Sequence, residues 1–263
     1  MRLDYQFNHK FLCRKASHLD FHLHAQGEVE LVIMLQGSCR VTCGSRVDVI
    51  RAGDIFCAFP NQPHKYEEST DVQAYLLIVP VKRYLSVYGN LLQKQLPTDP
   101  ICRSGQWDPT LLSLLESACL DMPHASEPVM QGYMMVIFGK ILEHFELTEQ
   151  KSGSEESLRR VLKYLNEHYR ETLSRKQIAK AVGYNESYIS HLFSETMQTT
   201  LTEYIHSLRV EDACRLLTET DVPVIQIGFD LGFASVRNFN RVFLKRTGMT
   251  PKQYRNNEKN KRP

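Results

Sequence analysis

Four side chains in the N-terminal part of the chain have the chemistry to act together. They are His22, His24, Glu30 and His64. Three imidazoles and a carboxylate can hold a transition-metal ion, and such sites support oxygenase or isomerase chemistry. The same groups can instead hydrogen-bond a polar ligand or satisfy one another within a core. His22 and His24 lie two residues apart, so on a regular strand they would share one face.

A second set of side chains is basic and lies near the C-terminus. Arg237, Arg241 and Lys245 recur every four residues, so on a helix they line one edge. An arginine fork matches the O6 and N7 edge of guanine, and each such pair gives about 1–3 kcal/mol of base discrimination. On an isolated helix this spacing is more typical of a solvated face, so the surrounding elements must decide between the two interpretations.

The basic edge belongs to the second copy of a duplicated unit. The copies cover residues 174–195 and 224–246, and they align when Gly183 is superposed on Gly232. Each has an apolar helical pattern, a glycine that allows positive φ, a polar N-cap and a second helical pattern. The expected N-caps are Asn185 and Ser235. Two short helices joined by such a turn form a helix-turn-helix, and a tandem pair is a far more specific signal than one copy.

The second helix of each copy is the element expected to enter a groove of double-stranded DNA. Its outward positions are therefore the expected DNA contacts. They are Glu186, Ser187, Ser190 and His191 in the first copy, and Val236, Arg237, Asn238, Asn240, Arg241 and Lys245 in the second. The first copy carries fewer charges, so arginine readout is expected from the second copy alone.

The tandem units, the helix between them and the closing stretch RVFLKRTGMTPKQYR (241–255) resemble the DNA-binding domain of the AraC/XylS family of bacterial transcription regulators. The resemblance implies that the two helices enter successive major grooves about 34 Å apart, held by a stiff connector at 200–218. It also implies contact with RNA polymerase and, more often than not, activation of transcription. One position departs from the family pattern. Gly228 replaces the usual alanine and costs about 1 kcal/mol of helix propensity, which predicts a looser second unit.

Residues 1–80 have the pattern of short strands separated by turns, typical of an antiparallel barrel or sandwich. The expected strands cover 29–35, 39–43, 46–50, 54–59 and 72–79. The order of several residues resembles the cupin barrel that forms the sensor domain of many AraC-family proteins. That order is His22-x-His24, Glu30, Gly37, Gly53-Asp54 and Pro60-x-x-Pro63-His64.

The cupin resemblance places His22, His24, Glu30 and His64 where enzymatic cupins carry metal ligands. Here the gap from His24 to Glu30 is longer than in those enzymes, and Gln62-Pro63 replaces the glycine expected before His64. We therefore expect no metal and no cofactor. The expected ligand is a small polar effector, such as a sugar or metabolite, contacting His22, His24, Glu30, Arg40, His64 and Tyr66. The alternatives are a metal-dependent cupin enzyme with a DNA-binding appendage, and a barrel that only dimerises.

The expected fold class is α+β with two domains. A cupin-like barrel (about 1–80) and helices at 81–96, 109–122 and 129–147 form a ligand-sensing and dimerisation domain over 1–147. A linker (148–157), an all-α DNA-binding domain with two helix-turn-helix motifs joined by a long helix (158–256) and a disordered tail (257–263) follow. The apolar centre of 129–147 suggests burial, in part against a second subunit, so we expect a homodimer.

Composition supports this division. Residues 155–263 carry a net charge of +5 and residues 1–154 a net charge of −3, which favours DNA binding by the C-terminal part. No signal-like segment or run of about 18 apolar residues occurs, so no membrane association is expected. Seven scattered cysteines suggest reduced core thiols in a cytoplasmic protein.

Overall fold

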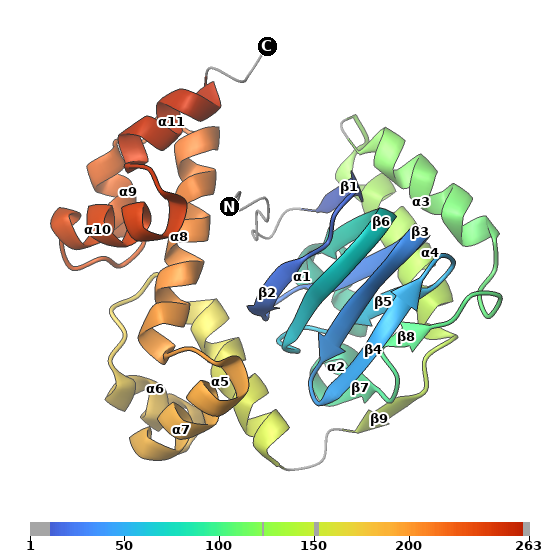
Figure 1. The fold of residues 1–263 in the computed structure, drawn as a ribbon, viewed down its shortest axis with the longest axis horizontal. Coiled ribbons are helices and arrows are strands. Elements are labelled where there is room, and N and C mark those ends of the chain that lie inside the picture. Colours follow the sequence, from blue (N-terminus) through green and yellow to red (C-terminus); the bar gives the residue numbers. More distant parts are fainter. Residues whose placement is uncertain (1–10, 123, 150–152, 260–263) are drawn as a thin grey trace. The chain divides into compact units, whose positions relative to one another are not determined.

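The computed structural model describes residues 11–122, 124–149 and 153–259. The chain divides into two compact units, and the division falls between Arg159 and Arg160 (Figure 1). The N-terminal unit is built on a β-sheet and the C-terminal unit is helical, so the expected α+β class is confirmed. Within the expected linker, β9 (Leu147–Glu149) and the start of α5 (Ser154–His168) are regular, and residues 150–152 lie outside the described residues.

The sheet of the N-terminal unit is antiparallel throughout its described pairs. Its strands follow the order β1 (Leu12–Ala16), β6 (His64–Val79), β3 (Val29–Cys43), β5 (Ile55–Ala58) and β8 (Ile101–Cys102). In addition, β2 (Phe21–His24) pairs with β6, and β4 (Arg46–Arg51) pairs with β3. A separate two-stranded sheet joins β7 (Gln95–Pro97) to β9.

The two central strands are longer than the sequence suggested. β3 runs through residues 36–38, which were expected to form a turn, and its register against β6 shifts there. Gly37 has φ of 79°, and a Cβ on it would lie 2.2 Å from the carbonyl oxygen of Thr70. Only glycine fits, and the expected turn is instead an irregularity that bends a continuous strand. β6 likewise begins at His64 rather than at residue 72.

Helices cover one face of this sheet. In place of one helix over 81–96 there are α1 (Val81–Tyr84), a 3₁₀ turn η1 (Ser86–Tyr88) and α2 (Gly89–Lys94), followed by α3 (Thr110–Asp121) and α4 (Glu127–Leu142). Leu115 of α3 and Phe138 of α4 are buried in one core cluster with Leu31 and Leu77 of the sheet. Because side chains alternate along a strand, Leu31 faces the helices and its neighbour Glu30 faces the opposite side.

Cys13 of β1 and Cys119 of α3 are joined by a disulfide. The expectation of reduced thiols was wrong for this pair. The fold brings residues separated by 106 positions to a Cα–Cα distance of 5.7 Å, inside the range of about 4.4–6.8 Å that a disulfide spans. The remaining cysteines are free and buried: Cys39, Cys43, Cys57, Cys102 and Cys214.

The C-terminal unit contains both expected helix pairs (Figure 1). The first pair is α6 (Arg175–Val182) and α7 (Glu186–Met197), and the second is α9 (Val224–Asp230) and α10 (Val236–Thr247). Between them lies α8 (Leu201–Glu219). A final helix, α11 (Pro251–Lys259), extends past residue 257, where the tail was expected to begin. Residues 260–263 of that tail lie outside the described residues.

Local hydrogen bonds start and stop these helices at the predicted positions. The Asn185 side chain accepts from the backbone N–H of Tyr188 at 2.7 Å, and the Ser235 hydroxyl accepts from that of Asn238 at 3.2 Å. Gly183 and Gly232 have φ of 79° and 77°, the left-handed conformation that ends a helix. The two copies of the sequence unit therefore share the same left-handed glycine in the turn and the same kind of N-cap on the second helix.

Gly228 is explained by packing. It is buried on α9, and a Cβ there would approach Cδ1 of Phe239 to 2.9 Å. Phe239 is fully buried in the core that α8, α9 and α10 share. The missing methyl group leaves room for the Phe239 ring against α9.

Candidate functional site

Three of the expected ligand-contacting residues meet inside the N-terminal unit. His24 ends β2, Glu30 lies on β3, and His64 begins β6. Their side chains are at most 7% exposed, and their ligand atoms lie within 4.8 Å of one another. We call these three residues the His–Glu cluster. It lies on the sheet face opposite the helices, as the alternation along β3 requires.

Backbone carbonyls fix the orientation of both imidazoles. Nδ1 of His24 lies 3.0 Å from the carbonyl oxygen of His22, and Nδ1 of His64 lies 2.8 Å from that of Gln62. A carbonyl can only accept, so each Nδ1 carries a proton, and in the neutral form of either ring the lone pair is on Nε2. Those Nε2 atoms lie 3.7 Å and 3.5 Å from the same carboxylate oxygen, Oε2 of Glu30.

Glu30 is held by two further donors. The Tyr66 hydroxyl donates to Oε1 at 2.7 Å, and Nε2 of Gln26 donates to Oε2 at 2.8 Å. Burial disfavours the carboxylate, but the neighbouring histidines outweigh it and hold the pKa of Glu30 well below its usual value. Burial, together with His64, lowers the pKa of His24 to about 4. At neutral pH the cluster therefore contains a carboxylate beside a neutral His24.

The side chains of two expected ligand contacts are exposed and do not join the buried cluster. The register of β2 shifts between Phe21 and His24, so His22 is exposed while His24 is buried. The two rings lie 6.4 Å apart between centroids, but the strand is irregular there and the two histidines differ in burial. Arg40 is exposed and forms an ion pair with Glu68 at 2.7 Å. Tyr66, in contrast, is buried, and its hydroxyl contacts Glu30.

Two residues that hold the cluster, or the loop leading into it, were not identified from the sequence. Gln26 is buried and orients Glu30, and a glutamine in a loop gives no pattern signal. Arg159, in the first turns of α5, is buried within the N-terminal unit and donates to the carbonyl oxygens of Pro60, at 2.7 Å, and Leu92. Burial lowers the pKa of Arg159 to about 10. This arginine holds the loop that leads into His64.

The second helix of the first pair has a polar outer face. On α7, Ile189, Leu192 and Phe193 are buried. Glu186, Ser187 and His191 are exposed, and Ser190 is half-buried. His191 lies 3.2 Å from Glu195 through Nδ1 and a carboxylate oxygen. The expected contact residues of this copy are therefore accessible, although its histidine has an acidic neighbour.

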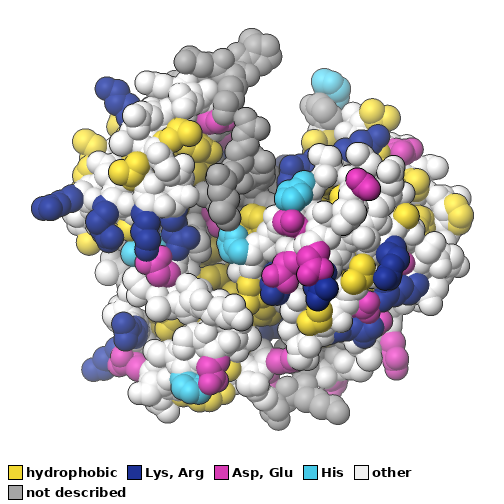
Figure 2. Space-filling model, viewed as in Figure 1, with side chains coloured by type: hydrophobic (Ala, Val, Ile, Leu, Met, Phe, Trp, Pro, Cys, Tyr) yellow, Lys and Arg dark blue, Asp and Glu magenta, His cyan; other side chains and the backbone are white. Residues whose placement is uncertain are grey.

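The second helix of the second pair has a basic outer face. Arg237, Asn240, Arg241 and Lys245 are exposed on α10, whereas Val236 and Asn238 are half-buried. Figure 2 shows Lys and Arg side chains gathered over this part of the molecule. Arg241 donates to the side-chain oxygen of Asn238 at 2.9 Å. The three basic residues expected to line one edge are thus all accessible.

Glu203 of α8 lies beside this basic edge. Its carboxylate is 3.3 Å from Nζ of Lys245 and 3.0 Å from Nη2 of Arg246. Arg246 also donates to the backbone carbonyl of Glu203. The pKa of Glu203 is lowered despite its partial burial, because Lys245 and Arg246 favour the carboxylate. The charge of Lys245 is therefore partly neutralised by Glu203. Helical spacing could not indicate this contact, because the two residues lie on different helices.

Arg209 ties α8 to both helix pairs. Its guanidinium donates to the carbonyl oxygens of Tyr169 and Glu171, each at 2.7 Å, in the segment leading to the first pair. It also donates to that of Gly232, at 2.8 Å, in the turn of the second pair. Arg209 is 7% exposed. One buried cation thus joins the connector to the segment before the first copy and to the turn of the second copy, which supports the stiff connector that the family resemblance implies.

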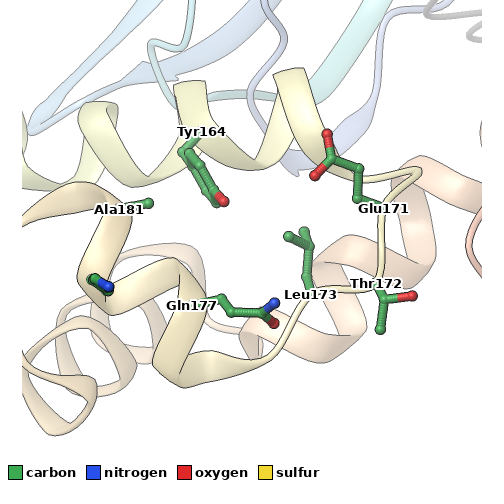
Figure 3. A pocket seen from close by; sticks show the side chains of 7 residues that line it. Tyr164, Glu171, Thr172, Leu173, Gln177 and Ala181 are labelled. Atoms are coloured by element: carbon green, nitrogen blue, oxygen red, sulfur yellow. The ribbon is translucent and has the colours of Figure 1, made fainter.

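An open hollow also lies in the C-terminal unit, between α5 and α6 (Figure 3). Tyr164, Leu173 and Gln177 line it. The Gln177 side chain is engaged at the N-cap of α6, where its oxygen accepts from the backbone N–H of Ser174 at 2.8 Å. Gln177 therefore serves the start of α6, and we assign no ligand to the hollow.

Two family models match this chain. The AraC-like ligand binding domain matches residues 12–130, and a helix-turn-helix domain matches residues 178–257. Among curated proteins, the uncharacterised HTH-type transcriptional regulator YdiP of Escherichia coli is 24% identical over 250 residues, covering 91% of this chain and 82% of YdiP. The regulator SAS0078 of Staphylococcus aureus is 33% identical over 108 residues, which are 41% of this chain and 14% of SAS0078.

Solved structures of ToxT from Vibrio cholerae share the two-domain fold. One is 13% identical with a TM-score of 0.57 and covers 94% of this chain and 97% of ToxT. Within the described residues, no helix is long and apolar enough to cross a bilayer. The relatives and both family models are those of regulators and not of enzymes. The chain belongs to the AraC family of transcriptional regulators, with an N-terminal ligand-binding domain and a C-terminal helix-turn-helix DNA-binding domain.

Proposed function

We propose that this regulator is a cytoplasmic activator of transcription whose DNA binding responds to a small polar effector in the N-terminal unit. The observation that carries the proposal is the pair of capped helices α7 and α10, with polar outer faces, on one connector. Helices so presented can enter successive major grooves, about 34 Å apart along the duplex. The arginines of α10 supply base readout, and α7 contributes weaker contacts through Ser187, Ser190 and His191.

The effector is proposed to bind at the His–Glu cluster and Tyr66. Buried polar groups that converge from different strands are the usual means of orienting a small ligand. The side chains of His22 and Arg40 are exposed, so any contact from them would come from the surface. One ToxT structure, 16% identical to this chain, is described as bound to an unsaturated fatty acid. The polar cluster here favours a different ligand chemistry.

Regulation requires thermodynamic linkage between the two units. The effector must bind one arrangement of the regulator more tightly than another, and DNA must prefer one of the same arrangements. Homodimerisation is part of the proposal because a dimer presents two DNA-binding domains. Val129 and Val136 on α4 are about half exposed and are the residues proposed to contribute to that contact. Sedimentation of the full-length protein would contradict it by showing a monomer with and without DNA.

DNA recognition is tested with sites selected in vitro from random duplexes by the full-length protein. Arg241→Ala should relax preference at one base pair and weaken binding by about 1–3 kcal/mol. Lys252→Ala removes an exposed charge on α11. It should weaken binding slightly, and to the same extent for all DNA sequences. If both variants behaved identically, α10 would not be a recognition helix. A reporter gene downstream of the selected site then distinguishes activation from repression.

A further inference from the structure

We propose that His24, Glu30 and His64 bind one divalent transition-metal ion, and that this ion is the effector. The inference rests on the proposed function, because it names the ligand class of the same site. It replaces the sugar or metabolite expected from the sequence with a metal ion. The observations that carry it are distances, orientations and burial within the His–Glu cluster.

The spacing of the three side chains suits a small tetrahedral ion. Zinc bonds to histidine nitrogen and carboxylate oxygen are about 2.0–2.2 Å long, which places neighbouring ligand atoms about 3.3–3.6 Å apart. The two Nε2 atoms lie 3.5 Å and 3.7 Å from Oε2 of Glu30. Because all three ligand atoms lie within 4.8 Å of one another, shifts of well under a bond length would bring them onto one ion.

The orientation of the two imidazole rings places Nε2 of each histidine toward the carboxylate of Glu30. Both Nδ1 atoms donate to backbone carbonyls, so in the neutral rings both Nε2 lone pairs point toward an anionic oxygen. Nε2 of His64 is buried and has no hydrogen-bond partner among the described residues. Buried polar atoms without partners cost about 1–3 kcal/mol each. A cation between the nitrogens and the carboxylate would give Nε2 of His64 a partner and would neutralise the charge of Glu30 at the same point.

The surroundings also resemble those of metal ligands. Metal-binding histidines usually donate their second nitrogen to a carbonyl or carboxylate, and ligating carboxylates accept further hydrogen bonds. His24 and His64 make the first kind of contact, and Gln26 and Tyr66 supply the second kind to Glu30. Three protein ligands leave a fourth position of a tetrahedral ion for water or another small molecule. Two nitrogens and one oxygen suit zinc, iron, cobalt or nickel better than calcium or magnesium.

The test uses the full-length protein, stripped with a chelator and dialysed against Zn²⁺ or Co²⁺. We expect about one ion per chain and, with Co²⁺, a visible absorption band from a nitrogen- and oxygen-ligated ion. His24→Gln, Glu30→Gln and His64→Gln should each weaken binding at least about tenfold, the loss that even an outer hydrogen-bond partner produces. His22→Gln is the matched control: its side chain is exposed two residues from His24, and metal binding should be unchanged.

Several results would overturn the inference. Wild-type protein that retains no ion after dialysis does so directly, even if a variant fails to fold. Equal binding by His22→Gln and His64→Gln, or an intense thiolate-to-cobalt band from the buried cysteines, would place the ion elsewhere. Circular dichroism and Trp107 fluorescence verify that each variant folds.

DNA affinity separates this inference from the proposed function. If the ion binds and shifts affinity for the selected DNA at least fivefold, both stand. A bound ion that leaves DNA affinity unchanged supports the metal site but contradicts its role as effector. An organic metabolite that shifts DNA affinity in metal-free protein supports the proposed function and refutes the ion as effector.

Discussion

Replacing Arg209 by methionine should uncouple the two helix pairs of the DNA-binding domain. The guanidinium is 7% exposed and donates to three carbonyl oxygens at 2.7–2.8 Å. Two of those carbonyls lie in the segment leading to the first pair, and the third belongs to Gly232 in the turn of the second. Methionine fills similar volume but donates no hydrogen bond, so the change isolates the polar contacts.

The expected loss of stability follows from the number of carbonyls left without a donor. A buried acceptor that loses its partner costs about 1–3 kcal/mol, and hydrogen bonds from a charged group lie at the upper end. Water entering beside the half-buried segment would recover part of this. We therefore expect the free energy of unfolding of the C-terminal unit to fall by about 3–5 kcal/mol. Arg209→Lys keeps the charge but not the fork, so its loss should be intermediate.

Urea unfolding of the full-length protein can measure this change in one unit alone. Trp107 is the only tryptophan, and its indole donates to the carbonyl of Gly53 at 2.8 Å, so fluorescence follows the N-terminal unit. Far-UV circular dichroism is dominated by the helical C-terminal unit. Arg237→Met, at an exposed position of α10, is the control and should weaken DNA binding without changing either transition. A circular dichroism transition that stays within about 0.5 kcal/mol in Arg209→Met, the range of ordinary surface changes, would refute the bracing role.

Three further changes have directions set by the structure. Gly228→Ala should destabilise the C-terminal unit by about 1 kcal/mol, because overpacking against Phe239 outweighs the gain in helix propensity; urea unfolding that showed stabilisation would contradict the contact at 2.9 Å. Glu203→Gln should raise DNA affinity about two- to fivefold and steepen its salt dependence, since it releases Lys245 toward phosphates; equal affinity in a titration of labelled DNA would argue that Lys245 does not approach DNA. Burial raises the pKa of Glu211 to about 8, so the folded state retains a proton that the unfolded state loses near pH 4.5. Stability of the C-terminal unit should then fall as pH rises from about 5 to 8, and Glu211→Gln should remove that slope in urea unfolding at several pH values.

The helices of the C-terminal unit could be predicted from the sequence because the interactions that start and end them are local. Asn185 and Ser235 cap helices through contacts three residues away, and Gly183 and Gly232 end helices through their own φ angles. Apolar spacing within each helix then determines which side is exposed. What could not be read were contacts between helices, such as Glu203 with Lys245. These depend on packing geometry, and helical periodicity contains no information about it.

The N-terminal unit was harder because its function depends on strand register. Assigning alternate residues to opposite faces assumes a regular strand. The irregularity between Phe21 and His24 breaks that assumption. It turns His22 to the surface and leaves His24 facing Glu30 and His64. The same irregularity reduces an expected set of three histidines to two. The exposure of His22 thus has a functional consequence: substitution there should affect neither cluster chemistry nor metal binding, although the sequence alone ranked it equal to His24.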